Sequence, residues 1–392
     1  MIRVLFVDDE VPQLQRLDRQ LLQMRERMDI RYSMSADRAI DALRQEPFDA
    51  VVADLRMPGT DGISLLDRVQ SEFPQIARFM LLDEAPDGLA MRAMPIAHQL
   101  FCKPGDVREL TASIERVCRL GKRSLHPRIR EALGRMRSIP SLPRLYWDLV
   151  RTIDRADCSA QSVAAIIEQD ASLTARALQM ANSAFLAPGR RIGSVREAVM
   201  RIGMLPIRSI VLAQYLVRAM AASAQPPGFS LDAVQSHSLR TAHAASAMVG
   251  SGPERVTAFS AGVLHGIGTV LMAVAMPFDY VDTRREAGDT GEPVHRVELR
   301  RYGCHHAHIG AYMLTLWGLP EALVDAVEHH HEPAEAGERF SAAAAVHVAS
   351  ALVGVPQRET GQFPAELDLP FLERVGVRDK LTVWHRELFA AL

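Results

Sequence analysis

Three groups of charged side chains follow short apolar runs in the first part of the chain. Asp8 and Asp9 follow the first run, Asp54 ends the second, and Lys103 follows the third. Apolar runs without polar alternation are typical of strands buried on both faces of a parallel sheet. The carboxyl ends of such strands carry the chemistry of open α/β sheets. Because Mg²⁺ prefers oxygen ligands, the acids and the lysine together predict a magnesium and phosphoryl site.

The loop after Asp54 adds a second signal, since it reads DLRMPGTDG from that residue. Its Met57-Pro58-Gly59 segment breaks the chain, and Thr60 or Asp61 is suited to cap a new helix. With this loop, the acidic pair and a Lys-Pro pair, residues 1–120 resemble the receiver domain of bacterial response regulators.

The resemblance assigns roles to these residues. It implies a Mg²⁺ site with four ligands, namely Asp8, Asp9, Asp54 and the backbone carbonyl of Arg56. Asp54 would be the nucleophile that takes a phosphoryl group from a partner sensor histidine kinase. Lys103 would neutralise the phosphoryl oxygens.

Two positions depart from the receiver pattern. Receivers place a Ser or Thr hydroxyl after the fourth strand, where this chain has Asp83, and an aromatic residue where it has Leu100. A hydroxyl donates to a phosphoryl oxygen, whereas an ionised carboxylate repels it. We therefore hypothesise that Mg²⁺ binds but that phosphorylation is weak, short-lived or poorly coupled. Two alternatives stay open: Asp83 turns away as a helix cap, or another group or water supplies the hydroxyl's hydrogen bond in an ordinary switch.

Strands and helices are expected to alternate over residues 1–121, which predicts an α/β flavodoxin-like (βα)5 receiver. The expected strands are 2–7, 30–34, 49–54, 78–82 and 99–102, and the expected helices are 11–27, 36–45, 61–72, 85–94 and 106–120. We place a linker or helix at 122–134, with the last receiver helix broken at Gly121.

Beyond the linker only amphipathic helical patterns are found, so an all-α domain is expected. Segments 169–185, 194–203, 263–268 and 302–333 resemble the HDOD domain, a helical output module related to HD phosphohydrolases. The resemblance covers about 135–335, and 336–392 is expected to pack on it as a helical extension. HDOD domains as a family are regarded as non-catalytic, so the resemblance implies a protein-interaction output.

Ten of the 14 histidines lie between positions 237 and 331. Those that match the HD metal pattern as remnants are His237, His265, His308, His329 and His330. The HD pair itself is His265-Gly266, and glycine supplies no ligand where that pattern needs an aspartate. We therefore expect packed or hydrogen-bonded histidines and no metal in this domain, although imidazoles alone suit a transition metal.

Charge, hydropathy and cysteine content indicate which partners and which cellular compartment to expect for this chain. The net charge of −2 and the lack of a long basic run give no support for a nucleic-acid partner. The apolar stretch 256–278 is long enough to span a bilayer, but it contains a histidine and three glycines, so we expect a buried hairpin or bent core helix. Four cysteines without a C-x-x-C pair and the absence of a signal peptide favour a reduced, cytoplasmic protein without membrane insertion.

The sequence thus predicts a cytoplasmic response regulator whose HDOD output contacts a downstream signalling protein, with enzymes of cyclic-dinucleotide signalling as conceivable partners. Two copies could pair through their last receiver helices. The alternative is a metal-dependent HD-type phosphohydrolase, or cyclic-dinucleotide phosphodiesterase, with a degenerate ligand set. A third hypothesis makes the receiver a permanent docking module that is never phosphorylated.

Overall fold

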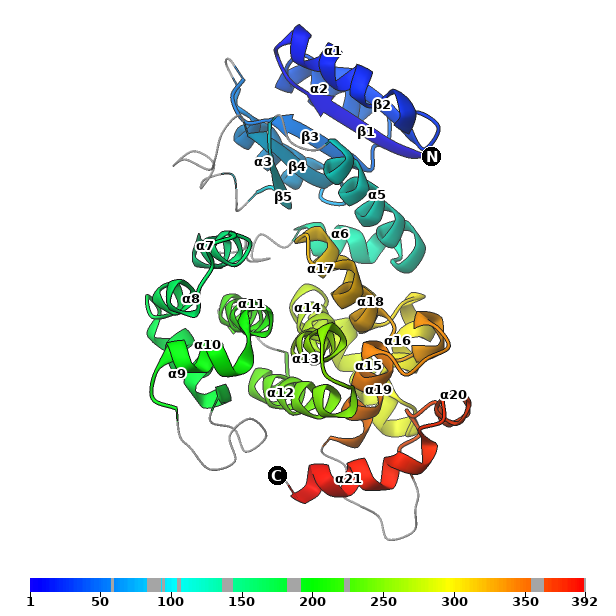
Figure 1. Cartoon of the computed structure of the whole chain (residues 1–392). Coiled ribbons are helices and arrows are strands. Elements are labelled where there is room, and N and C mark those ends of the chain that lie inside the picture. The colour runs from blue at the N-terminus through cyan, green and yellow to red at the C-terminus, as the bar shows by residue number, and fades with distance from the viewer. Residues whose placement is uncertain are drawn as a thin grey trace. The chain divides into compact units, whose positions relative to one another are not determined.

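The computed structural model describes residues 1–57, 60–82, 93, 96–103, 107–135, 144–181, 192–221, 226–353 and 363–390. The chain divides into two compact units (Figure 1). The first consists of Met1–Leu142 and Tyr312–Leu319, and the second of Pro143–Ala311 and Pro320–Leu392. The first unit contains the sheet and the second is helical.

The first unit is built on a five-stranded parallel sheet of order β2-β1-β3-β4-β5. Its strands are β1 (Ile2–Val7), β2 (Met28–Ser33), β3 (Ala50–Asp54), β4 (Ala77–Leu82) and β5 (Gln99–Cys102). Each strand starts within two residues of its predicted position. The predicted flavodoxin-like sheet is therefore confirmed.

Helices α2 and α3 pack on one face of this sheet, and their apolar residues form a common core with alternate residues of β1, β3 and β4. The helices of this unit are α1 (Val11–Gln20), the short 3₁₀ helix η1 (Leu22–Met24), α2 (Ala36–Gln45), α3 (Gly62–Glu72), α5 (Val107–Ser124) and α6 (Pro127–Arg135). Asp61 caps α3 by accepting from the backbone N–H of Ser64 at 2.8 Å. The predicted helix 85–94 lies almost wholly outside the described residues.

Two predicted helix ends in this unit are wrong. Helix α1 ends at Gln20 rather than near 27, and η1 follows it. Helix α5 continues through Gly121 to Ser124, both of which are buried. Burial of this face outweighs the weak helix propensity of glycine. The predicted linker therefore begins inside α5 and contains α6, which contacts α3.

The second unit is helical throughout its described residues, and the last residues of one of its helices, 312–316, belong to the first unit. Its helices are α7 (Arg144–Ile153), α8 (Ala160–Ile167), α9 (Ala171–Ala181), α10 (Val195–Ile202), α11 (Met204–Ala221), α12 (Leu231–Met248), α13 (Pro253–Leu264), α14 (Ile267–Ala275), α15 (Pro277–Thr290), α16 (Val294–Tyr302), α17 (His306–Leu316), α18 (Glu321–Glu328), α19 (Ala342–Leu352), α20 (Leu369–Arg374) and α21 (Leu381–Ala390). The 3₁₀ helices η2 (Pro333–Ala336) and η3 (Arg378–Lys380) lie between them. The predicted all-α class is confirmed.

Helix α13 is the centre of this unit, because α11, α12, α18 and α19 all contact it. Among the described residues, one helical stretch, Pro253–Ala275, is long and apolar enough to span a membrane. In its most apolar segment of 18 residues, 78% is buried inside the protein. It bends at His265-Gly266, where α13 ends and α14 begins. The prediction of a bent core helix is therefore confirmed.

Candidate functional site

Acidic side chains and a lysine meet at the carboxyl end of the parallel sheet. Asp8 follows β1, Asp54 is the last residue of β3, and Lys103 follows β5. Strands β1 and β3 are neighbours, with Val7 paired to Ala53, so the two aspartates lie side by side at the same edge. Both carboxylates are almost fully buried.

Lys103 joins the two carboxylates. Its Nζ lies 2.6 Å from Oδ1 of Asp54 and 3.0 Å from Oδ2 of Asp8. The other oxygen of each carboxylate accepts a backbone N–H at 2.9 Å, from Arg56 for Asp54 and from Glu10 for Asp8. The two carboxylates therefore both contact the positively charged ammonium group of Lys103.

Burial and the ion pairs set the proton affinities in this cluster. Burial raises the pKa of Asp54, against the opposing effects of Lys103 and of the N–H of Arg56. Burial alone would lower the pKa of Lys103, but its hydrogen bonds to Asp54 and Asp8 raise that pKa above its usual value. Lys103 therefore stays charged, and Asp54 is a carboxylate whose negative charge is compensated by one neighbour.

The remaining positions predicted for the receiver lie around this cluster or outside the described residues. Asp9 follows Asp8 and is partly exposed, so its carboxylate is accessible at the same edge. Leu100 lies within β5 and packs against the apolar core shared with α2 and α3. Asp83 is not among the described residues.

A second polar centre lies in the helical unit, where histidines gather around the start of α17 and the end of α18. His306, His330 and His331 each offer a ring nitrogen, and these three atoms lie within 4.8 Å of one another. The Nε2 atoms of His306 and His331 are 3.0 Å apart. These three side chains form the histidine trio.

Fixed acceptors orient two rings of the trio. Nδ1 of His306 lies 2.7 Å from Oε2 of Glu298, a buried carboxylate of α16 that also accepts the backbone N–H of His306. Nδ1 of His330 lies 2.7 Å from the carbonyl oxygen of Val327. Because each Nδ1 faces an acceptor, the neutral form of each ring carries its proton on Nδ1 and its lone pair on Nε2.

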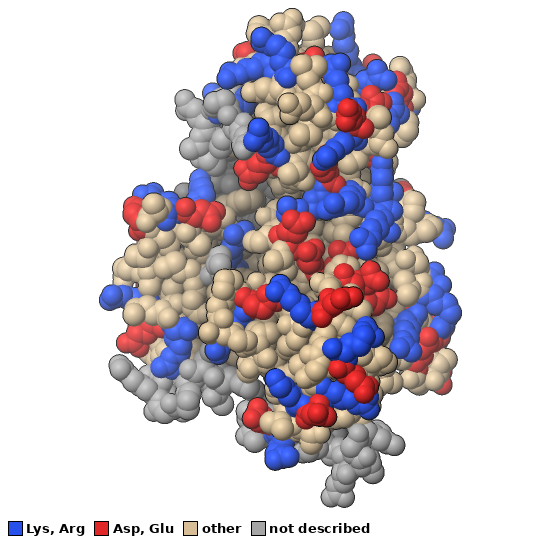
Figure 2. Space-filling view, turned by 45° about the vertical axis from the view of Figure 1, so that its right-hand side comes forward, with Lys and Arg blue, Asp and Glu red and all other residues tan. Residues whose placement is uncertain are grey.

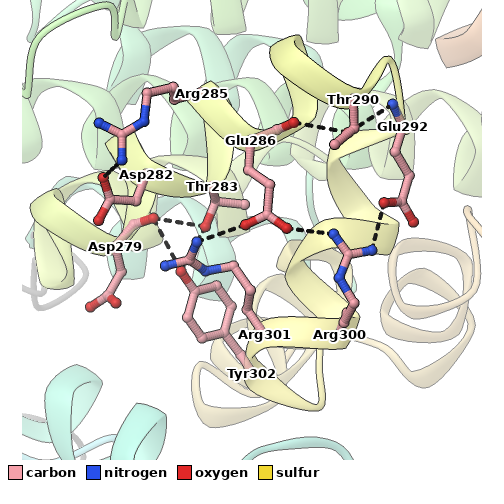
Figure 3. Close-up of polar contacts among 10 residues, drawn as sticks. All are labelled: Asp279, Asp282, Thr283, Arg285, Glu286, Thr290, Glu292, Arg300, Arg301 and Tyr302. Carbon is pink, nitrogen blue, oxygen red and sulfur yellow. Dashed lines mark hydrogen bonds and ion pairs between the residues drawn. The ribbon is translucent and has the colours of Figure 1, made fainter.

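Ion pairs hold α16, which carries Glu298, against α15 (Figure 3). Glu286 of α15 accepts from Arg300 at 2.5 Å and from Arg301 at 2.8 Å. The hydroxyls of Thr283 and Tyr302 are 2.6 Å apart, joining the same two helices. This network fixes the helix that orients His306.

A cavity of about 430 Å³ opens beside the trio, and all three rings line it. Its wall also contains His237, His265, Arg284 and Glu366, among other residues. The His265 ring lies 5.2 Å from that of His330 and 5.4 Å from that of His237, centroid to centroid. Burial lowers the pKa of His265 to about 3, so this ring is neutral.

Gly266 lies on the cavity wall where the HD pattern has its aspartate. A Cβ at this position would lie 2.8 Å from Oγ of Ser238 and 3.0 Å from Cγ1 of Val234. The side chains of Ser238 and Val234 in α12 would therefore have to shift to admit an aspartate at this position.

The structure separates the five histidines that the sequence suggested as remnants of a metal site. His237, His265 and His330 line one cavity. His308 instead stacks on His305, with ring centroids 3.8 Å apart. Nε2 of His329 faces Glu328 at 3.8 Å.

Sequence reasoning missed His306, His331 and Glu298 as members of the site. The runs 305–308 and 329–331 are rich in histidine, so the clustering itself was a signal. Which members point inward depends on where α17 begins and α18 ends, and helix ends are poorly determined by sequence.

Two family models match the chain. Residues 4–115 match the response regulator receiver domain, and residues 139–333 match the HDOD domain.

Curated relatives match parts of the chain. An uncharacterized protein of Treponema pallidum is 25% identical over 209 residues, which are 53% of this chain and 40% of that protein. The response regulator protein PilR of Pseudomonas aeruginosa is 31% identical over 122 residues, 29% of this chain and 26% of PilR. The transcriptional regulatory protein FixJ of Bradyrhizobium diazoefficiens is 37% identical over 81 residues, 20% of this chain and 40% of FixJ. The chain thus spans at most 40% of the length of these relatives.

Solved structures share the fold. A protein of Shewanella amazonensis, provisionally named a phosphohydrolase, is 22% identical with a TM-score of 0.50, covering 69% of this chain and 95% of its own. A protein of Marinobacter aquaeolei, provisionally named a signal transduction protein, is 17% identical with a TM-score of 0.50, covering 83% and 82%. At these identities the likeness concerns the fold alone.

Proposed function

The chain belongs to the signal-transduction response regulators, with a receiver domain and an HDOD domain, and we propose that phosphorylation of Asp54 controls a non-catalytic HDOD output. The observation that carries this proposal is the cluster of Asp8, Asp54 and Lys103 at the carboxyl edge of the sheet. A buried carboxylate with a fixed cation beside it is suited to attack a phosphoryl group and to hold the product's charge.

Mg²⁺ fits the receiver site by the chemistry of its donors. All four expected ligands offer oxygen atoms, namely Asp8, Asp9, Asp54 and the backbone carbonyl of Arg56. Two of these carboxylates, Asp8 and Asp54, already contact the ammonium group of Lys103. When bound, Mg²⁺ supplies positive charge for the oxygens of the incoming phosphoryl group. The positive charge of Lys103 offsets the electrostatic repulsion between the two buried aspartates. The backbone N–H of Arg56 fixes the Asp54 carboxylate by bonding one oxygen.

The residue type at position 83 limits this reaction. An ionised Asp83 cannot donate a hydrogen bond to a phosphoryl oxygen, and its charge opposes that of the phosphoryl group. We therefore expect low occupancy or a short lifetime for phosphorylated Asp54.

Phosphorylation can be tested on the full chain by intact-mass measurement after incubation with acetyl phosphate and Mg²⁺. We expect one phosphoryl adduct at low occupancy in the wild type, no adduct in Asp54→Asn, and a higher occupancy in Asp83→Ser. High and stable occupancy in the wild type would refute the role given to Asp83. An absence of adduct in both the wild type and Asp83→Ser would favour the permanent docking module.

The non-catalytic output rests on Gly266. The HD pattern uses an aspartate there as an oxygen ligand, and this chain lacks that carboxylate. A side chain at this position would also press on Ser238 and Val234. We infer that the helical domain acts by binding a downstream signalling protein. A sensor histidine kinase is the expected donor upstream.

The face drawn in Figure 2 gives no support for a nucleic-acid partner, because acidic and basic side chains are mixed among the described residues there. With a net charge of −2, the chain offers little long-range attraction for phosphates. A protein partner therefore remains our proposal for the output.

A phosphohydrolase is the second candidate, because a cavity of about 430 Å³ lined by histidines also exposes Arg284, a side chain suited to phosphate. Turnover of cyclic dinucleotides by the full chain, lost in His265→Ala, would establish it. We expect no turnover in either protein. Activity in the wild type would overturn the non-catalytic output without affecting phosphorylation of Asp54.

A further inference from the structure

Helix α17 contributes residues to both compact units of the chain. Its first residues, from His306, belong to the second unit, and Tyr312–Leu319 belong to the first. We propose that α17 transmits changes at strand β5 of the receiver to the histidine-lined cavity, and that Gln99 is the residue through which β5 holds the helix. This inference rests on the proposed function, since it names the route by which Asp54 would act on the helical domain.

The side chain of Gln99 joins β5 to the end of α17 within the first unit. Its Nε2 donates to the carbonyl oxygen of Thr315 at 2.9 Å, and its Oε1 accepts from the hydroxyl of Ser113 in α5 at 2.7 Å. Gln99 and Thr315 are both buried. Because both ends of the amide are hydrogen-bonded, its orientation is fixed, and breaking these bonds would leave buried polar groups without partners.

A left-handed glycine ends α17 at this contact. Gly318 has a φ of +68°, and its N–H donates to the carbonyl of Thr315 at 2.9 Å. The N–H of Leu319 donates to the carbonyl of Leu314 at 3.0 Å, which completes the usual hydrogen-bond pattern of a helix end at glycine. The carbonyl of Thr315 therefore accepts from Gly318 and from Gln99, so the helix end and β5 share one acceptor.

A second contact holds the same segment against α5. A Cβ on Gly121 of α5 would lie 2.9 Å from Cε2 of the Tyr312 ring. Tyr312 is buried, as are Met313 and Leu316, which follow it in α17. The glycine that weakens α5 thus makes room for an aromatic ring of α17. Residues 312–319 are therefore held by both β5 and α5.

The start of α17 is fixed within the second unit. The backbone N–H and Nδ1 of His306 lie 2.9 and 2.7 Å from Oε2 of Glu298. A Cβ on Gly268 would lie 1.8 Å from the carbonyl oxygen of His306, and one on Gly310 would lie 3.1 Å from Cγ2 of Ile267. The 11 residues of α17 form one helix about 16 Å long, which is a rigid element. A displacement of its end therefore reaches His306, which lines the cavity.

Strand β5 also leads to the group that responds to the state of Asp54. It begins at Gln99 and is followed by Lys103, whose Nζ contacts Asp54 and Asp8. A phosphoryl group on Asp54 would place negative charge farther from the sheet, so Lys103 must move to stay paired with it. Since β5 is the last strand of the sheet and pairs with β4, it shifts more readily than a strand bonded on both sides. We infer that this shift pulls on α17 through Gln99.

Transmission along α17 can first be tested without phosphorylation, by hydrogen exchange of the full chain with Mg²⁺. Gln99→Met keeps the length of the side chain and removes its hydrogen bonds, so it should speed exchange of residues 312–319 about 2–10-fold. We expect faster exchange at residues 306–311 as well. Gln15→Met is the matched control, because Gln15 is exposed on α1, and it should change neither segment. Faster exchange confined to residues 312–319 would overturn the proposal.

The same proteins are then compared with and without beryllofluoride, which imitates a phosphoryl group on the aspartate. In the wild type and in Gln15→Met we expect changed protection at residues 306–311. In Gln99→Met we expect changes at the carboxyl edge of the sheet and none at 306–311, and a full response there would refute the role of Gln99.

If Gln99→Met does not fold, Ser113→Ala takes its place, since it removes the hydroxyl that orients Gln99. Exchange at residues 306–311 that stays equal to the wild type in this variant would count against the proposal. The failure of the proposed function gives a different result. If the first experiment succeeds and the wild type shows no response to beryllofluoride at 306–311, control by Asp54 is refuted and transmission along α17 stands.

Discussion

Lys103 holds together two carboxylates that would otherwise repel each other inside the protein. Its side chain is 17% exposed, and those of Asp8 and Asp54 are 3% and 5% exposed. At this burial the charges are poorly screened by water, so removing one partner leaves an uncompensated buried charge. The same lysine is the group that the resemblance assigns to the phosphoryl oxygens. In our proposal, the stability of this edge and the binding of the phosphoryl group thus depend on the same side chain.

Lys103→Met should destabilise the first unit by about 3–5 kcal/mol without metal, because it leaves two buried acids side by side. Mg²⁺ should restore part of this loss, since it binds the same acids. Hydrogen exchange of β3 and β5, with and without Mg²⁺, measures both effects. Lys122→Met is the matched control, because Lys122 pairs with Asp49 from a side chain that is 45% exposed. Equal losses in the two variants would contradict this account.

The two sites differ in how far the sequence could predict them. Asp8, Asp54 and Lys103 end or follow strands, and parallel strands bring such residues to one edge whatever the details of the helices. The histidine trio depends on helix ends and on which of several adjacent histidines turns inward. Neighbouring residues of a helix point about 100° apart, so an error of one residue changes the ligand set.

Close contacts between helix backbones shape the second unit. A Cβ on Gly268 of α14 would lie 1.8 Å from the carbonyl oxygen of His306, at the start of α17. A Cβ on Gly262 of α13 would lie 2.4 Å from Cα of Ala242 in α12. These glycines let helices approach more closely than any side chain would allow. The contact at Gly268 sets the position of a trio member.

Gly268→Ala should therefore destabilise the second unit by about 1–3 kcal/mol or more, because the clash is with backbone. Gly288→Ala is the control. Gly288 lies in the exposed part of α15 with open space around its Cα, so alanine there should stabilise the helix by about 0.5–1 kcal/mol. Urea unfolding followed by circular dichroism compares the two. A stable Gly268→Ala variant would show that α14 and α17 can separate at little cost.

At this scale the strands were more predictable than the helix ends. Strands β1, β3 and β4 are largely buried apolar runs, and the extent of each follows from that pattern. Strand β2 alternates polar and apolar residues, and it starts two residues before its predicted position. In the second unit two long helical stretches are interrupted, between α13 and α14 at His265-Gly266 and between α16 and α17 at 303–305. The second break has a local signal, because Gly303 adopts the left-handed conformation that ends a helix. The first lies in apolar sequence without proline or a left-handed glycine.

At the scale of the whole molecule the chain has two centres of polar side chains. One is the cluster of Asp8, Asp54 and Lys103 at the edge of the sheet, and the other is the group of histidines in the helical domain. Such a regulator works if phosphorylation of the receiver stabilises one conformation of the chain over another. The conformation or dynamics of the helical unit must therefore change when Asp54 is phosphorylated. The comparisons establish the two domains, and coupling between them is our central claim.

Hydrogen exchange of the full chain with Mg²⁺, before and after addition of beryllofluoride, tests that claim most directly. Beryllofluoride imitates a phosphoryl group on the aspartate and avoids the low occupancy expected from Asp83. We predict changed protection both at the carboxyl edge of the sheet and in helices of the second unit, with neither change in Asp54→Asn. Changes confined to the receiver in the wild type would contradict control of the helical output by Asp54.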